Sequence, residues 1–206
     1  RNALVLAPHT DDGELGAGGM IARMLENGTK VTYAAFSTAE NSVRNGWPKD
    51  ILTTEVKAAT KALGIAPENL IIFNYEVRKL NFSRQDVLED LIKLRANNYD
   101  LVLMPSLNDI HQDHSTVSQE GLRAFKGTTM LGYELIWNNL KFNTECFVPL
   151  ERKHLDKKLL ALSQYKSQSH RDYFSESFIT SLATARGVQI GVSYAEAFEV
   201  IRLVYR

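Results

Sequence analysis

The chain has 206 residues, 44% of them hydrophobic, and its 24 basic and 24 acidic side chains cancel to a formal net charge of zero. A chain of this length can bury most of its apolar surface in one core, so we expect a single domain over residues 1–206. The balanced charge argues against nucleic acid as the main partner. The single cysteine excludes an intrachain disulfide and a four-thiolate metal cluster, so any metal site must use histidine and carboxylate.

Nothing in the sequence predicts a membrane segment. Its apolar runs fall short of the roughly 20 residues that span a bilayer, and the opening run within residues 1–8 is too short for a signal peptide. We therefore expect no membrane span, with a cytoplasmic location as the default. Domains of this kind commonly associate, so a homo-oligomer is also compatible with the sequence, which indicates no interface.

Apolar runs and helical periods alternate along the first half of the chain. Apolar runs predict strands at 4–7, 30–36, 70–73 and 101–104, and helical spacing predicts helices at 20–25, 52–63 and 83–95. Asn27-Gly28 and Gly64 supply the expected helix ends. The fourth strand is apolar without alternation, which is typical of a parallel sheet covered on both faces.

The second half continues less regularly. We expect a fifth strand at 132–137, a helix at 153–165 and a last strand at 198–204, whereas 166–195 is rich in Ser and Gln and is expected to form loops over one face. The whole pattern predicts an α/β, Rossmann-like fold. Its doubly wound, mostly parallel sheet would have strand order 3-2-1-4-5, an added C-terminal strand and helices on both faces.

The first polar cluster follows the first predicted strand directly and contains His9, Asp11 and Asp12. Ligands of doubly wound sheets bind outside the carboxyl ends of the strands, where this turn lies. A glycine-rich turn with a capping aspartate explains the same residues without any function. Glycines 16, 18 and 19 do not form a dinucleotide fingerprint, because the third glycine is replaced by Ile21.

The second polar cluster follows the fourth predicted strand and contains His111, Asp113 and His114. Strands one and four are neighbours in the expected order, so both clusters should face one cleft. His9, Asp12 and His114 then form a ligand set of two histidines and one carboxylate, with open positions for water or substrate. Asp11 is a candidate general base and His111 a candidate oxyanion donor.

These motifs carry a resemblance to a known family. The segments His9-Thr10-Asp11-Asp12, Leu15-Gly16-Ala17-Gly18-Gly19 and His111-Gln112-Asp113-His114 resemble the LmbE-like, or PIG-L, family of metal-dependent de-N-acetylases. Segments around Glu55, at 132–134, at 186–187 and at 194–198 extend the match over nearly the whole chain. The resemblance implies removal of the acetyl group from an N-acetylglucosamine-type sugar or its conjugate.

The resemblance also implies a role for each motif residue. It places Zn2+ on His9, Asp12 and His114, although the same ligands accept Fe2+. Asp11 would be the general base, His111 would stabilise the oxyanion or act as acid, and Asp113 would orient a neighbouring histidine. The zero net charge suits a small uncharged amino sugar as the substrate.

The sequence departs from the family pattern at several positions. Thr10 replaces a usual Pro, Gly13 stands where Glu is common, which leaves the role of Glu14 open, and Leu52 stands where relatives often carry a substrate-binding Arg. Arg44 and Arg78 follow the second and third predicted strands at the functional edge of the sheet. They are the candidate replacements for substrate binding.

Two other functions remain open at this point. Two histidines and a carboxylate are also the ligands of iron(II) oxygenases, although those enzymes usually have all-β scaffolds. A sugar-binding module without catalysis is the second alternative. It would need neither Asp11 nor His111.

Overall fold

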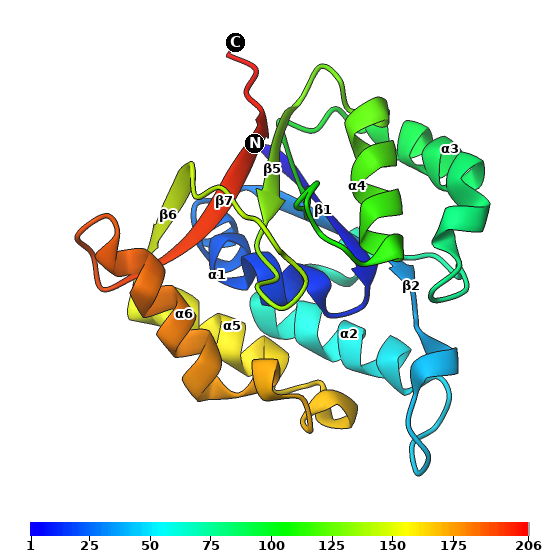
Figure 1. Cartoon of the computed structure of the whole chain (residues 1–206), viewed down its shortest axis with the longest axis horizontal. Coiled ribbons are helices and arrows are strands. Elements are labelled where there is room, and N and C mark those ends of the chain that lie inside the picture. Colours follow the sequence, from blue (N-terminus) through cyan, green and yellow to red (C-terminus); the bar gives the residue numbers. More distant parts are fainter. Residues whose placement is uncertain (206) are drawn as a thin grey trace.

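The structure, a computed structural model that describes residues 1–205, contains a seven-stranded sheet with helices on both faces (Figure 1). The strands are β1 (Asn2–His9), β2 (Lys30–Ser37), β3 (Leu70–Ile72), β4 (Leu101–Pro105), β5 (Thr129–Tyr133), β6 (Cys146–Leu150) and β7 (Tyr194–Arg202). Their order is β3-β2-β1-β4-β5-β7-β6. The first five are parallel, and β7 pairs antiparallel with both β5 and β6. The predicted doubly wound order and the C-terminal strand are confirmed.

The central strand β1 is buried on both sides because helices cover each face. Ala3, Val5 and Ala7 pack into one core, and Leu4 and Leu6 pack into the other. One face carries α1 (Asp12–Glu26), α2 (Ile51–Leu63), α5 (Arg152–Leu162) and α6 (Glu176–Val188), and the opposite face carries α3 (Arg84–Arg95) and α4 (Gln112–Ala124) (Figure 1). Continuous apolar runs were therefore the correct signal for these strands.

The second half of the chain differs from its prediction. The segment 166–195 contains α6 as well as two short 3-10 helices, at Lys166–Gln168 and Asp172–Phe174. The fifth strand begins and ends earlier than expected, and β6 and α4 were not predicted. Helix α6 buries Ile179, Ala183 and Gly187, and because two of these three are small residues its buried face gives a weak apolar signal in the sequence. Within residues 1–205, no helix has both the length and the hydropathy needed to cross a bilayer.

Helix α1 is broken near its middle, at Ala17, whose φ of −143° and ψ of 15° lie outside the helical region. In an unbroken helix the N–H groups of Gly19 and Met20 would bond to carbonyls four residues earlier. They instead donate to the two carboxylate oxygens of Glu196 on β7, at 2.9 and 2.7 Å. The side chain of Lys158 on α5 donates to the carbonyl of Leu15 at 2.7 Å.

Lys158 and Glu196 thus satisfy the backbone groups that the break exposes, and they also pair with each other. The Lys158 Nζ and Glu196 Oε1 atoms are 2.7 Å apart, and both side chains are buried. Close packing accompanies the break, because a Cβ at Gly16 would overlap the ring of Tyr133. An inserted side-chain pair of this kind is a recognised cause of a helix kink.

We predict that Glu196→Gln lowers the free energy of unfolding by about 3–5 kcal/mol, because it leaves the Lys158 charge buried without its partner. Urea denaturation followed by circular dichroism measures the change. Asp156→Asn is the control, since Asp156 pairs with Arg152 on the exposed side of the same helix at 2.7 Å and such pairs contribute at most about 1 kcal/mol. Equal losses in the two variants would contradict this account of the break.

Candidate metal and active site

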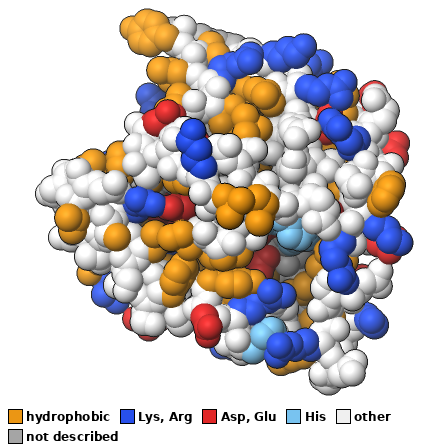
Figure 2. Space-filling view, in the orientation of Figure 1, with side chains coloured by type: hydrophobic (Ala, Val, Ile, Leu, Met, Phe, Trp, Pro, Cys, Tyr) orange, Lys and Arg blue, Asp and Glu red, His pale blue; other side chains and the backbone are white. Residues whose placement is uncertain are grey.

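A pocket of about 340 Å³ opens at the carboxyl ends of the parallel strands. Figure 2 shows histidine and acidic side chains on the floor of a hollow, with basic side chains at its rim. The polar residues come from the turn between β1 and α1 and from the loop between β4 and α4, as well as from four further loops. The two sequence clusters therefore meet at one cleft, as expected from the strand order.

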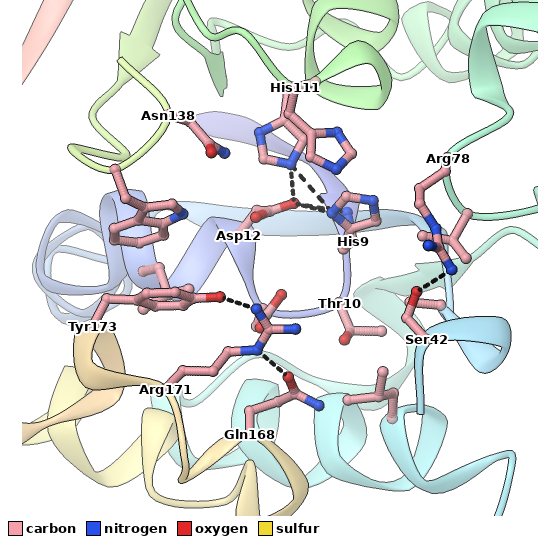
Figure 3. A pocket seen from close by; sticks show the side chains of 17 residues that line it. His9, Thr10, Asp12, Ser42, Arg78, His111, Asn138, Gln168, Arg171 and Tyr173 are labelled. Carbon is pink, nitrogen blue, oxygen red and sulfur yellow. Dashed lines mark hydrogen bonds and ion pairs between the residues drawn. The ribbon is translucent and has the colours of Figure 1, made fainter. Parts of the chain in front are cut away.

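Three side-chain atoms in this pocket form a compact triangle. His9 Nδ1, Asp12 Oδ2 and His114 Nε2 are separated pairwise by 3.2 Å (Figure 3). Tetrahedral bonds of about 2.0–2.1 Å to a Zn2+ ion place neighbouring ligand atoms about 3.3 Å apart. The triangle could accept a divalent cation at one corner of the pocket with little movement. Nitrogen atoms of His9, His111 and His114 also lie within 4.8 Å of one another, so the imidazole of His111 is close enough to be a further ligand.

Each of the two histidines in the triangle is oriented by a second carboxylate. His9 Nε2 lies 2.9 Å from Asp113 Oδ2, and His114 Nδ1 lies 2.7 Å from Asp109 Oδ2. Both carboxylates are buried. Such contacts fix the ring of a metal-binding histidine and direct its other nitrogen toward the metal. Asp113 also accepts backbone N–H groups of Arg78 and Leu80, at 2.6 and 3.2 Å, so it is itself held firmly.

The carboxylates favour additional positive charge at this position. Burial lowers the pKa of His9, but hydrogen bonds to Asp113 and Asp12 raise it to about 9. Burial likewise lowers the pKa of His114, and Asp12 and Asp109 raise it to about 10. Burial raises the pKa of Asp12, yet the two histidines hold it well below its usual range. The raised pKa values mean that the carboxylates favour a proton on each of the two histidines. A divalent cation supplies the same two positive charges, so this donor set suits a divalent cation.

His111 differs from the other two histidines because it caps the first turn of α4. Its Nδ1 accepts the backbone N–H of Asp113 at 3.1 Å, so its proton belongs on Nε2. Burial and the neighbouring His114 lower the pKa of His111 to about 4, which keeps the ring neutral. The remaining nitrogen is therefore an N–H donor in the pocket.

Asp11 and Glu14 occupy different surroundings although they are close in sequence. Asp11 lines the pocket, and burial together with repulsion from Asp12 raises its pKa to about 6. Glu14 is fully buried below the pocket, where its carboxylate contacts the hydroxyls of Tyr33 and Tyr165. Burial raises the pKa of Glu14 to about 8. Glu14 supports the turn from beneath and does not line the pocket.

The two arginines suggested for substrate binding are separated by the structure. Arg78 lines the pocket, and its guanidinium donates to Ser42 Oγ at 3.3 Å. It adopts a left-handed backbone conformation with φ of 67°. Arg44 is exposed and lies outside the residues that line the pocket.

Several residues around the pocket were not identified from the sequence. Asp109 lies two residues before the second histidine motif, and only the fold shows that it contacts His114. The opposite wall is formed by Trp137, Asn138, Gln168, Arg171 and Tyr173. Their spacing in sequence carries no signal, because they come from two loops that converge only in space.

Comparison with known proteins shows the family to which this chain belongs. The sequence model of the family PIG-L, GlcNAc-PI de-N-acetylase, matches residues 4–125. The "Uncharacterized deacetylase YaiS" of Escherichia coli is 29% identical over 176 residues, which are 81% of this chain and 91% of that protein. The "Probable N-acetyl-alpha-D-glucosaminyl L-malate deacetylase 2" of Bacillus cereus is 27% identical over 135 residues, 60% of each chain.

Solved structures share the fold. The conserved protein TT1542 of Thermus thermophilus superposes with a TM-score of 0.84 and 24% identity, over 99% of this chain and 96% of that one. GalB, the 4-carboxy-2-hydroxymuconate hydratase of Pseudomonas putida, superposes with a TM-score of 0.80 and 21% identity, over 100% of this chain and 99% of that one. Because a hydratase has the same fold, the fold alone does not decide the reaction.

We predict that the protein binds one Zn2+ or Co2+ per chain and that Asp109→Asn lowers the affinity about 10- to 100-fold, because His114 then contacts a neutral amide in place of a carboxylate. Competition with a chromophoric chelator measures the affinity. His114→Ala should lower it further, whereas Asp86→Asn, which changes an exposed carboxylate on α3, should have no effect. Unchanged affinity in Asp109→Asn would show that this contact does not serve a metal site.

Proposed function

This chain belongs to the PIG-L family, and from that membership we propose that it is a metal-dependent deacetylase. It would hydrolyse the N-acetyl amide of an N-acetylglucosamine-type sugar or its conjugate and release acetate and the free amine. The observation that most supports this proposal is the triangle of His9, Asp12 and His114, with Asp11 lining the same pocket. The names of the relatives support the same chemistry, because both are called deacetylases.

We propose that His9, Asp12 and His114 hold a divalent cation, and that this ion is zinc. Two imidazoles and one carboxylate suit Zn2+ and accept Fe2+ as well. When bound, such an ion supplies Lewis acidity that activates water and polarises the acetyl carbonyl. Asp109 and Asp113 would keep the two imidazoles in the orientation that binding requires.

Asp11 is the proposed general base. Among residues 1–205 its carboxylate has no hydrogen-bonding side chain as a partner, and burial raises its pKa to about 6, so it is a competent proton acceptor near neutral pH. It would take a proton from water as the water oxygen bonds to the acetyl carbon. The same proton would then pass to the sugar nitrogen as the carbon–nitrogen bond breaks, which leaves acetate and an amine.

His111 is the proposed oxyanion donor. Its neutral ring presents an Nε2–H group, because Nδ1 is occupied by the first turn of α4. A donor placed where negative charge develops on the carbonyl oxygen lowers the barrier, and removal of such a donor typically costs about 100- to 1000-fold in rate. The helix fixes this ring before the substrate arrives, so no reorganisation is required.

We predict that Asp11→Asn lowers the rate of amine release by about 100- to 10,000-fold while the metal content stays unchanged. A panel of N-acetylglucosamine and its 1-phosphate and methyl glycoside, with amine release as readout, measures activity, and metal analysis follows in parallel. His114→Ala is the matched control, since it should lose both metal and activity. An undiminished rate in Asp11→Asn would show that another group is the base.

The same assay separates the alternatives. Oxygen consumption that depends on Fe2+ would favour an iron(II) oxygenase and contradict the hydrolase. Sugar binding without amine release from any member of the panel would favour a binding module.

A further inference from the structure

We infer that the pocket contains an anion-binding subsite, built on Arg171 together with Thr10 and Arg78, for a carboxylate or phosphate group carried by the substrate. This inference rests on the proposed function, since it names the substrate class of that same pocket. It also differs from the expectation of an uncharged sugar that follows from the net charge of the chain.

The guanidinium of Arg171 is held so that one of its nitrogens remains available. Its Nε donates to Gln168 Oε1 at 2.8 Å and its Nη1 donates to the hydroxyl of Tyr173 at 2.6 Å (Figure 3). Tyr173 is itself fixed by stacking on Trp137, with ring centroids 4.0 Å apart. Within residues 1–205 the Arg171 Nη2 has no hydrogen-bond partner, and Figure 3 shows the guanidinium facing the interior of the pocket.

A chain of buried hydrogen bonds connects this arginine to the core. Gln168 is 7% exposed, and its Nε2 donates to Ser167 Oγ at 3.0 Å. Ser167 donates its hydroxyl and its backbone N–H to the carboxylate of Glu55 on α2, at 2.6 and 2.8 Å. The loop that carries Arg171 is therefore anchored before a ligand binds. Anchoring of this kind reduces the entropy lost on binding.

Thr10 provides an independent observation at the same pocket. Its side chain is 1% exposed and lines the pocket, and its Oγ1 has no hydrogen-bond partner in the described part of the chain. A buried hydroxyl without a partner is unfavourable unless a ligand or water satisfies it. In the view of Figure 3, Thr10 lies between Arg171 and Ser42, the residue that holds Arg78.

The two arginines of the pocket have no carboxylate bound to them within residues 1–205. Asp11 and Asp12 together carry two negative charges, and Arg78 and Arg171 together carry two positive charges. Neither arginine forms an ion pair within residues 1–205, because both are held by neutral oxygen atoms. With a divalent cation and the two arginines, the positive charges of the site balance the four carboxylates Asp11, Asp12, Asp109 and Asp113, so the available groups of Arg171 and Thr10, and not net charge, favour an anion. Both guanidinium groups are reached by solvent, and guanidinium groups bind carboxylate and phosphate through charge-assisted hydrogen bonds.

Direct binding tests the inference without requiring turnover. The probes are three amines that cannot be deacetylated: glucosamine 1-phosphate, the glycolic acid glycoside of glucosamine, and methyl glucosaminide, which has no anionic group. Trp137 lines the pocket and reports binding by fluorescence, measured with zinc-loaded protein in a Trp47→Phe background, since Trp47 is outside the pocket lining.

We expect wild type to bind one or both anionic probes more tightly than the methyl glycoside. Arg171→Gln should weaken binding of the preferred anion about 10- to 100-fold, because it removes a charge-assisted hydrogen bond, and should change methyl glucosaminide less than about twofold. Arg171→Lys should be intermediate, since it keeps the charge but not the planar fork. Lys166→Met, which removes an exposed positive charge from the same loop, is the matched control and should leave the affinities for all three probes unchanged.

The outcomes separate this inference from the proposed function. The preferred anion identifies whether phosphate or carboxylate is the ligand. Equal binding of all three probes by wild type would overturn the inference, as would an equal loss for all three in Arg171→Gln, which would mean that Arg171 serves the pocket's structure. If the anions bind as expected but the acetylated counterparts release no amine, the deacetylase proposal fails and the subsite stands.

Discussion

Parallel pairing of β1 with β4 is the constraint on which the site depends. Leu4 lies beside Val102 and Val5 beside Leu103 in the register of the two strands, so the chain leaves both strands at the same edge of the sheet. The turn after β1 then presents His9, and the first turn of α4 presents His114. Any shift in this pairing would separate the ligand atoms by several ångströms, because each residue of a strand advances about 3.3 Å.

The buried charges around this edge fall into two groups with different tasks. Asp109 and Asp113 contact the imidazoles of His114 and His9, whereas the Lys158–Glu196 pair contacts the backbone of α1. The break in α1 separates its first turn, which carries Asp12, from the rest of the helix. That turn can therefore place Asp12 beside His9 and His114, while the later turns follow the packing of the sheet.

The sequence predicted most of the strands and several of the helices, and the reason for success or failure differs between elements. Strands β1 to β4 were found because apolar runs buried on two faces are distinctive, and Gly64 marked the end of α2 because it adopts φ of 100° there. Helix α6 was missed because so few of its side chains are buried. Arg171 was missed because a long loop places it opposite the histidines, and no local spacing records such a contact.

The sequence by itself determined which side chains are available to a metal site. With one cysteine and with His9, His111 and His114 in two short motifs, it restricted a metal site to imidazole and carboxylate and indicated where the strands would bring them. Only the tertiary structure decided the geometry: the 3.2 Å triangle, the carboxylate beside the imidazoles of His9 and His114, and the groups of Arg171 and Thr10 that have no partner within residues 1–205. The reason is physical, since ligand chemistry belongs to a residue, whereas distances, burial and the electric field of a pocket arise only when distant segments pack together.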